Sequence, residues 1–238
     1  MTKHTEQSGK LKKRSSSDTS GRGLKTRVKT AKGRKTSSTR WLKRQLNDPY
    51  VRQAASEGYR SRAAYKLLQI DDRYRILKPG KKILDLGAAP GGWSQVAMER
   101  VGITGRVVAV DLNPWDPVPG VSSLMLDFLE PAAHDHIRSS IDGLADVILS
   151  DMAAPATGHA KTDHLRIIAL AEAAWDFAAS TLAPDGTFLC KVYQGGTERS
   201  LLAQLKASFF KVLHIKPAAS RKDSTEMYVL ASGFRDSS

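Results

Sequence analysis

The stretch ILDLGAAPGGWSQ, residues 83–95, decides the fold of this chain. It begins with an apolar run typical of a buried strand, continues through a cluster of small residues, and ends in a pattern typical of a helix start. Gly87, Gly91 and Gly92 remove side chains at points where a ligand could approach the backbone closely. The unpaired N–H groups of the helix start favour an electron-rich ligand at this turn.

The spacing of the turn excludes two common ligand classes. GAAPGG lacks the G-x-G-x-x-G spacing of dinucleotide-binding turns and carries Pro90 inside the turn. The Gly-Lys-Ser/Thr that ends a phosphate-binding P-loop is also missing. We therefore expect a ligand other than NAD or ATP at the end of this strand.

The positive charge of the chain is concentrated at its N-terminal end. The net charge is +13 over 238 residues, and residues 1–45 hold 15 Lys and Arg against two acidic residues. The first 38 residues contain almost no large apolar groups, so we expect a disordered basic tail over 1–38 and a folded domain over 39–238. A flexible polycation binds RNA by releasing counterions, although a purely solubilising role remains an alternative.

Composition also limits the setting of the protein. No run of 18 or more apolar residues and no apolar leader is present, so we expect a cytoplasmic protein without membrane contact. The lone Cys190 provides neither an internal disulfide nor a Cys-rich zinc site. The histidines show no ligand spacing, with His134 and His136 expected in a loop, so we expect no metal.

Alternating strand and helix patterns follow Pro79 and predict an α/β fold with a mostly parallel sheet covered on both faces. Only a polar loop separates the last two strands, so we expect them to pair antiparallel. The expected strands are 82–86, 106–111, 123–126, 146–150, 187–193, 211–216 and 227–232. The expected helices are 41–46, 50–57, 62–74, 92–101, 162–182 and 197–209.

Four aspartates lie at or after the ends of consecutive expected strands, where ligands bind in sheets of this kind. They are Asp85, Asp111, Asp127 and Asp151, and Lys191 lies on the fifth strand. Asp111 is placed to accept both hydroxyls of a ribose. A single acid after a strand is commonly a helix cap or turn former, but four in register indicate a ligand site.

Seven segments of the chain resemble the FtsJ/RrmJ-type (RlmE) ribosomal RNA large subunit 2′-O-methyltransferases, in the family's order and spacing. They are SRAAYKL, ILDLGAAPGGWSQ, VVAVDLNPW, LDF, VILSDMAAP, FLCKVYQG and STEMYVL. The resemblance covers essentially the whole expected domain. It implies a Rossmann-like S-adenosylmethionine-dependent methyltransferase fold, with a seven-stranded, mostly parallel sheet and an antiparallel last strand.

The resemblance also implies a set of residues for binding S-adenosylmethionine. Gly91 and Trp93 would contact its methionine end, Asp111 its ribose and Asp127 its adenine amino group, and Asp151 would lie beside the sulfonium. The full implied set is Asp85, Gly87, Gly91, Gly92, Trp93, Asp111, Asp127 and Asp151.

A catalytic group of four residues matches the family's Lys-Asp-Lys-Glu pattern. It consists of Lys66, Asp151, Lys191 and Glu226. Such a group would orient a ribose 2′-hydroxyl toward the methyl donor and assist loss of its proton. Burial and a second nearby cation lower the pKa of a lysine, and Lys66 and Lys191 would form such a pair. The resemblance, in which Lys191 is the central residue of the group, implies that Lys191 is the base. As an alternative, Lys191 only steers the hydroxyl and the proton leaves to water.

Other methyl acceptors fit the chain less well. SDMAAP after the fourth strand differs from the [DN]-P-P-[YF] of amino-methylating enzymes. A pyrimidine C5 enzyme needs a cysteine nucleophile, but strand alternation places Cys190 on the opposite face from Lys191.

The resemblance implies that the substrate is rRNA within the large ribosomal subunit, most simply a uridine ribose of 23S rRNA, and we expect a monomer. Another RNA such as tRNA, or a non-catalytic RNA-binding role in ribosome assembly, remains an alternative. Trp41, Tyr59 and Trp115 are candidates for stacking on a flipped base, and the loop at 159–161 for holding RNA.

Overall fold

The computed structural model describes residues 36–195 and 199–235. The basic tail expected over 1–38 therefore lies almost entirely outside the described residues. The chain divides into two compact units, residues 1–47 and 48–238. In the first unit, helix α1 (Thr36–Asn47) contains the expected helix 41–46 and begins earlier than expected.

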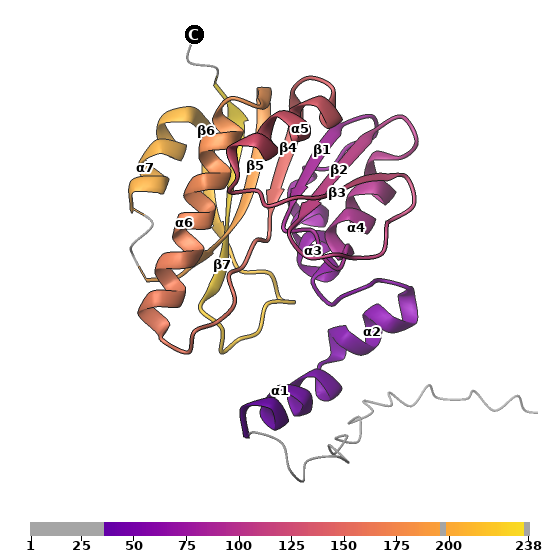
Figure 1. Ribbon diagram of the computed structural model, residues 1–238, viewed down its shortest axis with the longest axis vertical. Helices are drawn as coiled ribbons and strands as arrows, with labels where there is room; N and C mark the ends of the chain where they lie inside the picture. The colour runs from indigo at the N-terminus through magenta and orange to yellow at the C-terminus, as the bar shows by residue number, and fades with distance from the viewer. Residues whose placement is uncertain (1–35, 196–198, 236–238) are drawn as a thin grey trace, which may run out of the picture. The chain divides into compact units, whose positions relative to one another are not determined.

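The second unit is built on one seven-stranded sheet with the order β3-β2-β1-β4-β5-β7-β6 (Figure 1). Strands β1 to β5 pair in parallel, and β7 runs antiparallel to both β5 and β6, which confirms the expected topology. The strands are β1 (Lys82–Leu86), β2 (Arg106–Asp111), β3 (Val121–Met125), β4 (Ala145–Ser150), β5 (Leu182–Tyr193), β6 (Phe209–Ile215) and β7 (Glu226–Phe234).

Helices cover both faces of the sheet and enclose two apolar cores. Figure 1 shows α6 and α7 on one side of the sheet and α3 and α4 on the other. The α3–α4 core contains Leu67, Trp93 and Leu149, and the core under α5, α6 and α7 contains Ile137 and Phe188. The helices are α2 (Pro49–Glu57), α3 (Ala64–Tyr74), α4 (Gly92–Val101), α5 (Pro131–Ile141), α6 (Ala160–Ala179) and α7 (Arg199–Ser208).

Two helix expectations were wrong. Residues 134–136, expected in a loop, lie in α5, whose buried face is only Ala133, Ile137 and Ile141, a stripe too narrow to stand out in the sequence. The helix expected over 162–182 ends at Ala179, and Leu182 belongs to β5, where it pairs with Ala145. None of the helices in the described part of the chain combines the length and the hydropathy that a membrane span requires.

The reversal of β7 positions its first residues at the functional edge of the sheet. Tyr193, the last residue of β5, pairs with Glu226, the first residue of β7. The carboxyl ends of β1, β2, β4 and β5 and the beginning of β7 therefore meet along one edge, where parallel sheets bind ligands.

Candidate active site

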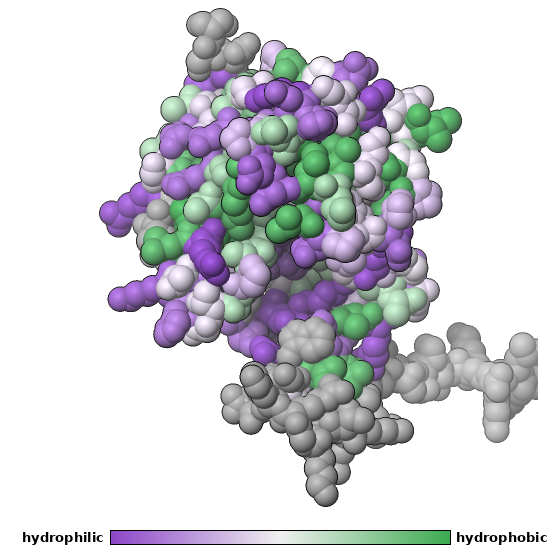
Figure 2. All heavy atoms as spheres, viewed as in Figure 1, coloured by the Kyte–Doolittle hydropathy of each residue, from purple (hydrophilic) through white to green (hydrophobic). Residues whose placement is uncertain are grey.

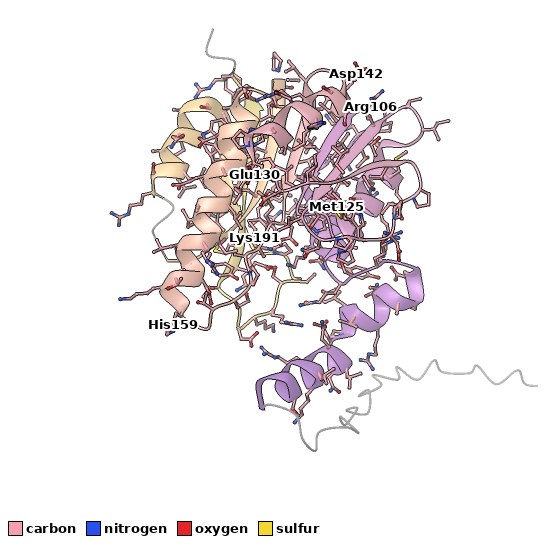
Figure 3. The ribbon with its side chains drawn as sticks, in the orientation of Figure 1. Arg106, Met125, Glu130, Asp142, His159 and Lys191 are labelled. Carbon is pink, nitrogen blue, oxygen red and sulfur yellow. The ribbon has the colours of Figure 1, made fainter. Side chains whose placement is uncertain are left out.

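The carboxyl edge of the sheet brings together the four residues expected to form the catalytic group. Lys66 comes from α3, Asp151 directly follows β4, Lys191 lies near the end of β5, and Glu226 begins β7. Both lysines are buried, each with 8% of its surface exposed. Figure 3 labels Lys191 in the lower half of the sheet, and Figure 2 shows a hollow bordered by hydrophilic residues toward the lower edge of the same view.

The four residues form two ion pairs. Lys191 Nζ lies 2.8 Å from Asp151 Oδ1 and also donates to the main-chain oxygen of Asp151 at 2.7 Å. Lys66 Nζ lies 2.7 Å from Glu226 Oε1 and donates to Oε2 at 2.9 Å. The second oxygen contact and a bond from Ser220 Oγ to Glu226 Oε1, at 2.9 Å, fix the position of the glutamate.

Tyr228 connects the two ion pairs and was not among the expected site residues. Its hydroxyl donates to Asp151 Oδ1 at 2.7 Å and accepts a hydrogen bond from Lys66 Nζ at 3.0 Å. The side chain is fully buried and packs against Trp93, with ring centroids 5.5 Å apart. Tyr228 follows Glu226 by two residues on one strand, so the two share a face, which is the pattern that could have revealed it.

The charges of the network are set by competition between burial and ion pairing. Burial lowers the pKa of Lys191, but Asp151 and Glu226 outweigh it, so the pKa of Lys191 is raised. Burial raises the pKa of Asp151, but Lys191 and Lys66 outweigh it, so the pKa of Asp151 is lowered. The expected lowering of the Lys191 pKa was therefore wrong for the protein alone. Lys191 is held there as an ammonium because a carboxylate, rather than the other lysine, is its direct neighbour.

A cavity of about 440 Å³ opens beside this network at the ends of the first four strands. Gly87, Asp111, Asp127 and Asp151 line it, together with apolar groups such as Phe128. Three of the four strand-end aspartates thus face one cavity, and Asp151 belongs both to the cavity and to the ion-pair network.

Backbone groups hold the two outer aspartates of this cavity. Asp111 Oδ2 accepts from the backbone N–H of Ala89 at 2.9 Å, and its Oδ1 accepts from that of Asn113 at 2.8 Å. Asp127 Oδ1 accepts from the backbone N–H of Leu129 at 3.0 Å. These bonds restrict the carboxylates to orientations in which their remaining lone pairs can accept from a ligand.

The fourth strand-end aspartate, Asp85, is fully buried beneath the turn and does not line the cavity. Its Oδ2 accepts from Ser94 Oγ at 2.6 Å, while its Oδ1 has no hydrogen-bond partner. Burial, opposed by the bond from Ser94 and assisted by the charges of Asp151 and Asp111, raises the pKa of Asp85 to about 7.

The glycines of the turn also differ in what surrounds them. A Cβ at Gly87, which has φ +80°, would lie 2.7 Å from the main chain of Met152, so only glycine allows the ends of β1 and β4 to approach. A Cβ at Gly91 would meet Val118, and one at Gly92 would meet Ser61. Gly91 and Gly92 therefore pack against the protein itself and do not line the cavity.

Trp93 is likewise buried away from the cavity. Its Nε1 donates to the main-chain oxygen of Ala63 at 2.8 Å, and its ring contacts Tyr228. Trp93 therefore joins α4 to α3 and supports the ion-pair network from behind.

Cys190 lies in the core under α5, α6 and α7, on the face opposite Lys191, as strand alternation predicted. It is fully buried, and burial raises the pKa of its thiol to about 12, which makes it unsuitable as a nucleophile. His134 and His136, expected in a loop, both lie on α5. Within residues 36–195 and 199–235, no group of three or more His, Cys, Asp or Glu is placed to hold a metal ion.

Two of the candidate stacking aromatics, Tyr59 and Trp115, lie outside both parts of this site. Tyr59 donates to Glu99 Oε2 at 2.8 Å and packs against Tyr65, so it has a structural role. Trp115 does not line the cavity, and the side chain of Trp41 lies outside the described residues.

Residues 59–234 match the family model described as FtsJ-like methyltransferase. The chain belongs to the FtsJ-like methyltransferase family. It is 59% identical over 222 residues to the ribosomal RNA large subunit methyltransferase E of Paramagnetospirillum magneticum, covering 91% of both chains. It is 58% identical over 218 residues to the protein of the same name from Xanthobacter autotrophicus, covering 90% of this chain and 86% of that one.

The fold of this family member is also found in a solved structure. A Plasmodium falciparum protein described as a ribosomal RNA methyltransferase superposes with a TM-score of 0.67 and is 33% identical. The match covers 74% of this chain and 98% of the other. The Rossmann-like methyltransferase fold expected from the sequence is confirmed.

Proposed function

We propose that the protein transfers a methyl group from S-adenosylmethionine to a ribose 2′-hydroxyl of large-subunit rRNA, most simply a uridine of 23S rRNA. The observation that carries the proposal is that Asp151 lines the cavity and also belongs to the buried Lys191–Asp151–Tyr228–Lys66 network. The names of relatives 58–59% identical to this chain support rRNA of the large subunit as the substrate.

The residues around the cavity fit S-adenosylmethionine. Asp111 and Asp127 offer carboxylate oxygens to ribose hydroxyls and to an adenine amino group, and Phe128 supplies an apolar wall. Asp85 does not line this cavity, and its part would be to hold Ser94 and the start of α4 beneath the turn. The bound cofactor would supply an activated methyl group. Gly91, Gly92 and Trp93 would contribute by shaping the turn and its support.

The network suits the acceptor because a ribose hydroxyl is a weak nucleophile that must be oriented before it reacts. Lys191 is held as an ammonium, so it can donate a hydrogen bond to the 2′-oxygen and direct the remaining lone pair of that oxygen. We favour this steering role, with the proton leaving to water, over the alternative in which Lys191 is the base. Tyr228 and Asp151 keep the lysine in place through the bonds described above.

The test uses large ribosomal subunits from cells that lack the enzyme, with methyl-labelled S-adenosylmethionine. We expect label in rRNA at a 2′-O-methylated nucleoside after complete nuclease digestion. Lys191→Met should lower the rate constant of transfer by about 10²- to 10⁴-fold while cofactor affinity stays within a few-fold. Label in a base, or cofactor binding without any transfer, would show that the proposal is wrong, and the latter result would support the non-catalytic RNA-binding alternative.

The N-terminal residues provide a separate part of the proposal. We propose that the basic residues before α1 contact rRNA electrostatically, because residues 1–35 carry 12 Lys and Arg against two acidic residues. Removing residues 1–35 should weaken binding to the large subunit and flatten its salt dependence. An unchanged salt slope would favour a solubilising role.

A further inference from the structure

A second cavity, of about 610 Å³, opens at the carboxyl edge between the start of α6 and the end of β5. We call it the α6–β5 pocket. It shares only Ala154 with the cofactor cavity, so the loop after β4 forms a wall between the two. The residues that line it are Ala154, Ala156, Ala160, Lys161, Asp163, His164, Leu165, Ile167, Tyr193, Gln194, Gly195 and Thr225.

The loop that forms this wall is held in one conformation by α6. Asp163 accepts hydrogen bonds from the backbone N–H and the hydroxyl of Thr157, both at 2.7 Å, and from the backbone N–H of Gly158 at 3.3 Å. Arg166 donates to the main-chain oxygen of Pro155 at 3.3 Å. The pocket is therefore bounded by a loop with fixed backbone contacts.

The opposite wall is equally well defined. The backbone N–H of Gln194 donates to the main-chain oxygen of Thr225 at 2.9 Å, which ties the end of β5 to the residue before β7. A Cβ at Gly195 would lie 2.6 Å from the ring of His164, so the chain passes close to α6 here. Tyr193 stands between these elements, with its ring centroid 6.2 Å from that of His164.

The chemistry of the pocket suits a flat heterocycle with a polar edge. Alanine, leucine and isoleucine side chains and the ring of Tyr193 supply apolar contacts. Gln194 and Thr225 supply an amide and a hydroxyl at the margin, and Lys161 adds an exposed positive charge. An unpaired nucleobase stacks on an aromatic ring and hydrogen-bonds along its edge, while its phosphate favours a nearby cation.

The pocket lies at a suitable distance from the reacting group. Tyr193 follows Lys191 by two residues on β5, which corresponds to about 7 Å along a strand. The two side chains share a face of β5, because alternate residues of a strand point to the same side. Figure 3 shows His159, the residue before α6, and Lys191 toward the same lower end of the domain. A ribose oriented by Lys191 would thus have its own base within reach of Tyr193.

We infer that the α6–β5 pocket holds the unpaired base of the nucleotide whose 2′-hydroxyl is methylated, with that base stacked on Tyr193. This inference rests on the proposed function and adds where the base binds. The donor and the target base then lie on opposite sides of the loop after β4, and the ribose reaches the network between them.

The first test compares Tyr193→Ala with Tyr193→Phe, using unmethylated large subunits from cells that lack the enzyme as substrate. Loss of one stacked base corresponds to about a 5- to 150-fold change, so Tyr193→Ala should raise the KM for the subunit by that factor. Tyr193→Phe retains the ring and should stay within about three-fold of wild type. Phe210→Ala, which removes a highly exposed aromatic side chain on β6, is the matched control and should leave KM unchanged.

The second test fills the pocket instead of removing the ring. Ala156 is an exposed loop residue, so Ala156→Trp should fold normally, block the base and raise KM as Tyr193→Ala does. Affinity for S-adenosylmethionine should stay within two-fold of wild type in both variants, because neither residue lines the cofactor cavity.

The outcomes separate this inference from the proposed function. If the wild type methylates a ribose but both Tyr193→Ala and Ala156→Trp keep the wild-type KM, the pocket does not hold the base and the inference is wrong. If the loss appears equally in Tyr193→Phe, with a shifted pH profile, Tyr193 acts through its hydroxyl on Lys191 and the stacking role is overturned. If the wild type itself transfers no methyl group to ribose, the proposed function fails first.

Discussion

The buried carboxyl group of Asp85 gives the sharpest prediction about stability. Its pKa is raised from 3.8 to about 7 because it has no exposed surface and only Ser94 to stabilise its charge. The folded state therefore binds this proton more tightly than the unfolded chain does. The contribution of Asp85 to stability is fully present below about pH 4 and is lost as the pH rises to about 7.

The size of the effect follows from the two pKa values. A shift of about three units at about 1.4 kcal/mol each gives a cost of about 4 kcal/mol for the charged form. Roughly 2–3 kcal/mol of this cost develops between pH 5 and pH 8 by proton linkage. Asp85→Asn removes the titration and keeps the shape of the side chain. The variant should therefore gain roughly 2–3 kcal/mol relative to wild type over this pH range.

Urea unfolding of the cofactor-free protein at pH 5, 6.5 and 8 and constant ionic strength measures the difference. Subtracting wild type from Asp85→Asn cancels the other carboxylates, including Asp151, whose lowered pKa has the opposite pH dependence. The corresponding change in Tm is roughly 5–10 °C for a domain of this size. A difference in unfolding free energy that stays constant from pH 5 to pH 8 would refute the reasoning.

Three further predictions concern the ion-pair network, the cofactor cavity and Cys190. Tyr228→Phe removes a hydroxyl bonded to two charged groups, so it should destabilise the fold by about 2–3 kcal/mol and reduce kcat. Thermal melting and initial rates measure the two effects, and an unchanged Tm would contradict the stabilising role of the hydroxyl. Asp111→Ala should raise the Kd for S-adenosylmethionine at least about ten-fold, measured by calorimetry, and Asp127→Ala is a parallel variant. Unchanged affinity in both variants would show that the two aspartates do not bind the cofactor. Cys190→Ala should keep kcat within about two-fold while lowering stability, and loss of transfer in a folded protein would restore a role for the thiol.

The strand positions and the site edge were predictable because the signals are local. The apolar runs of β1 and β4 and the aspartates after β2, β3 and β4 are read directly from the sequence, and the structure places these aspartates on one cavity. Strand alternation alone was enough to separate Cys190 from Lys191. The SRAAYKL segment contributes the start of α3, and this helix brings Lys66 to Glu226.

What the sequence did not predict depends on neighbours distant in the chain. Asp85 resembles the other strand-end aspartates, but it precedes the end of β1 by one residue and therefore points into the interior. The pKa of Lys191 depends on which charged group is nearest, and only the fold places Asp151 there rather than Lys66. Tyr228 lies in the STEMYVL segment, but its role was not evident there because it arises from bonds to two residues more than 70 positions away.

The antiparallel final strand contributes site residues from a stretch of sequence separate from the one that forms the donor cavity. The four aspartates and the glycine turn lie in residues 85–151, whereas Glu226 and Tyr228 enter from a strand added at the far end of the chain. A protein could exchange this terminal β6–β7 hairpin and still retain every strand that shapes the donor cavity. Changes of acceptor during evolution, or by design, are therefore expected to concentrate in the start of α6, the end of β5 and the β6–β7 hairpin, because these carry the α6–β5 pocket, Lys191 and Glu226.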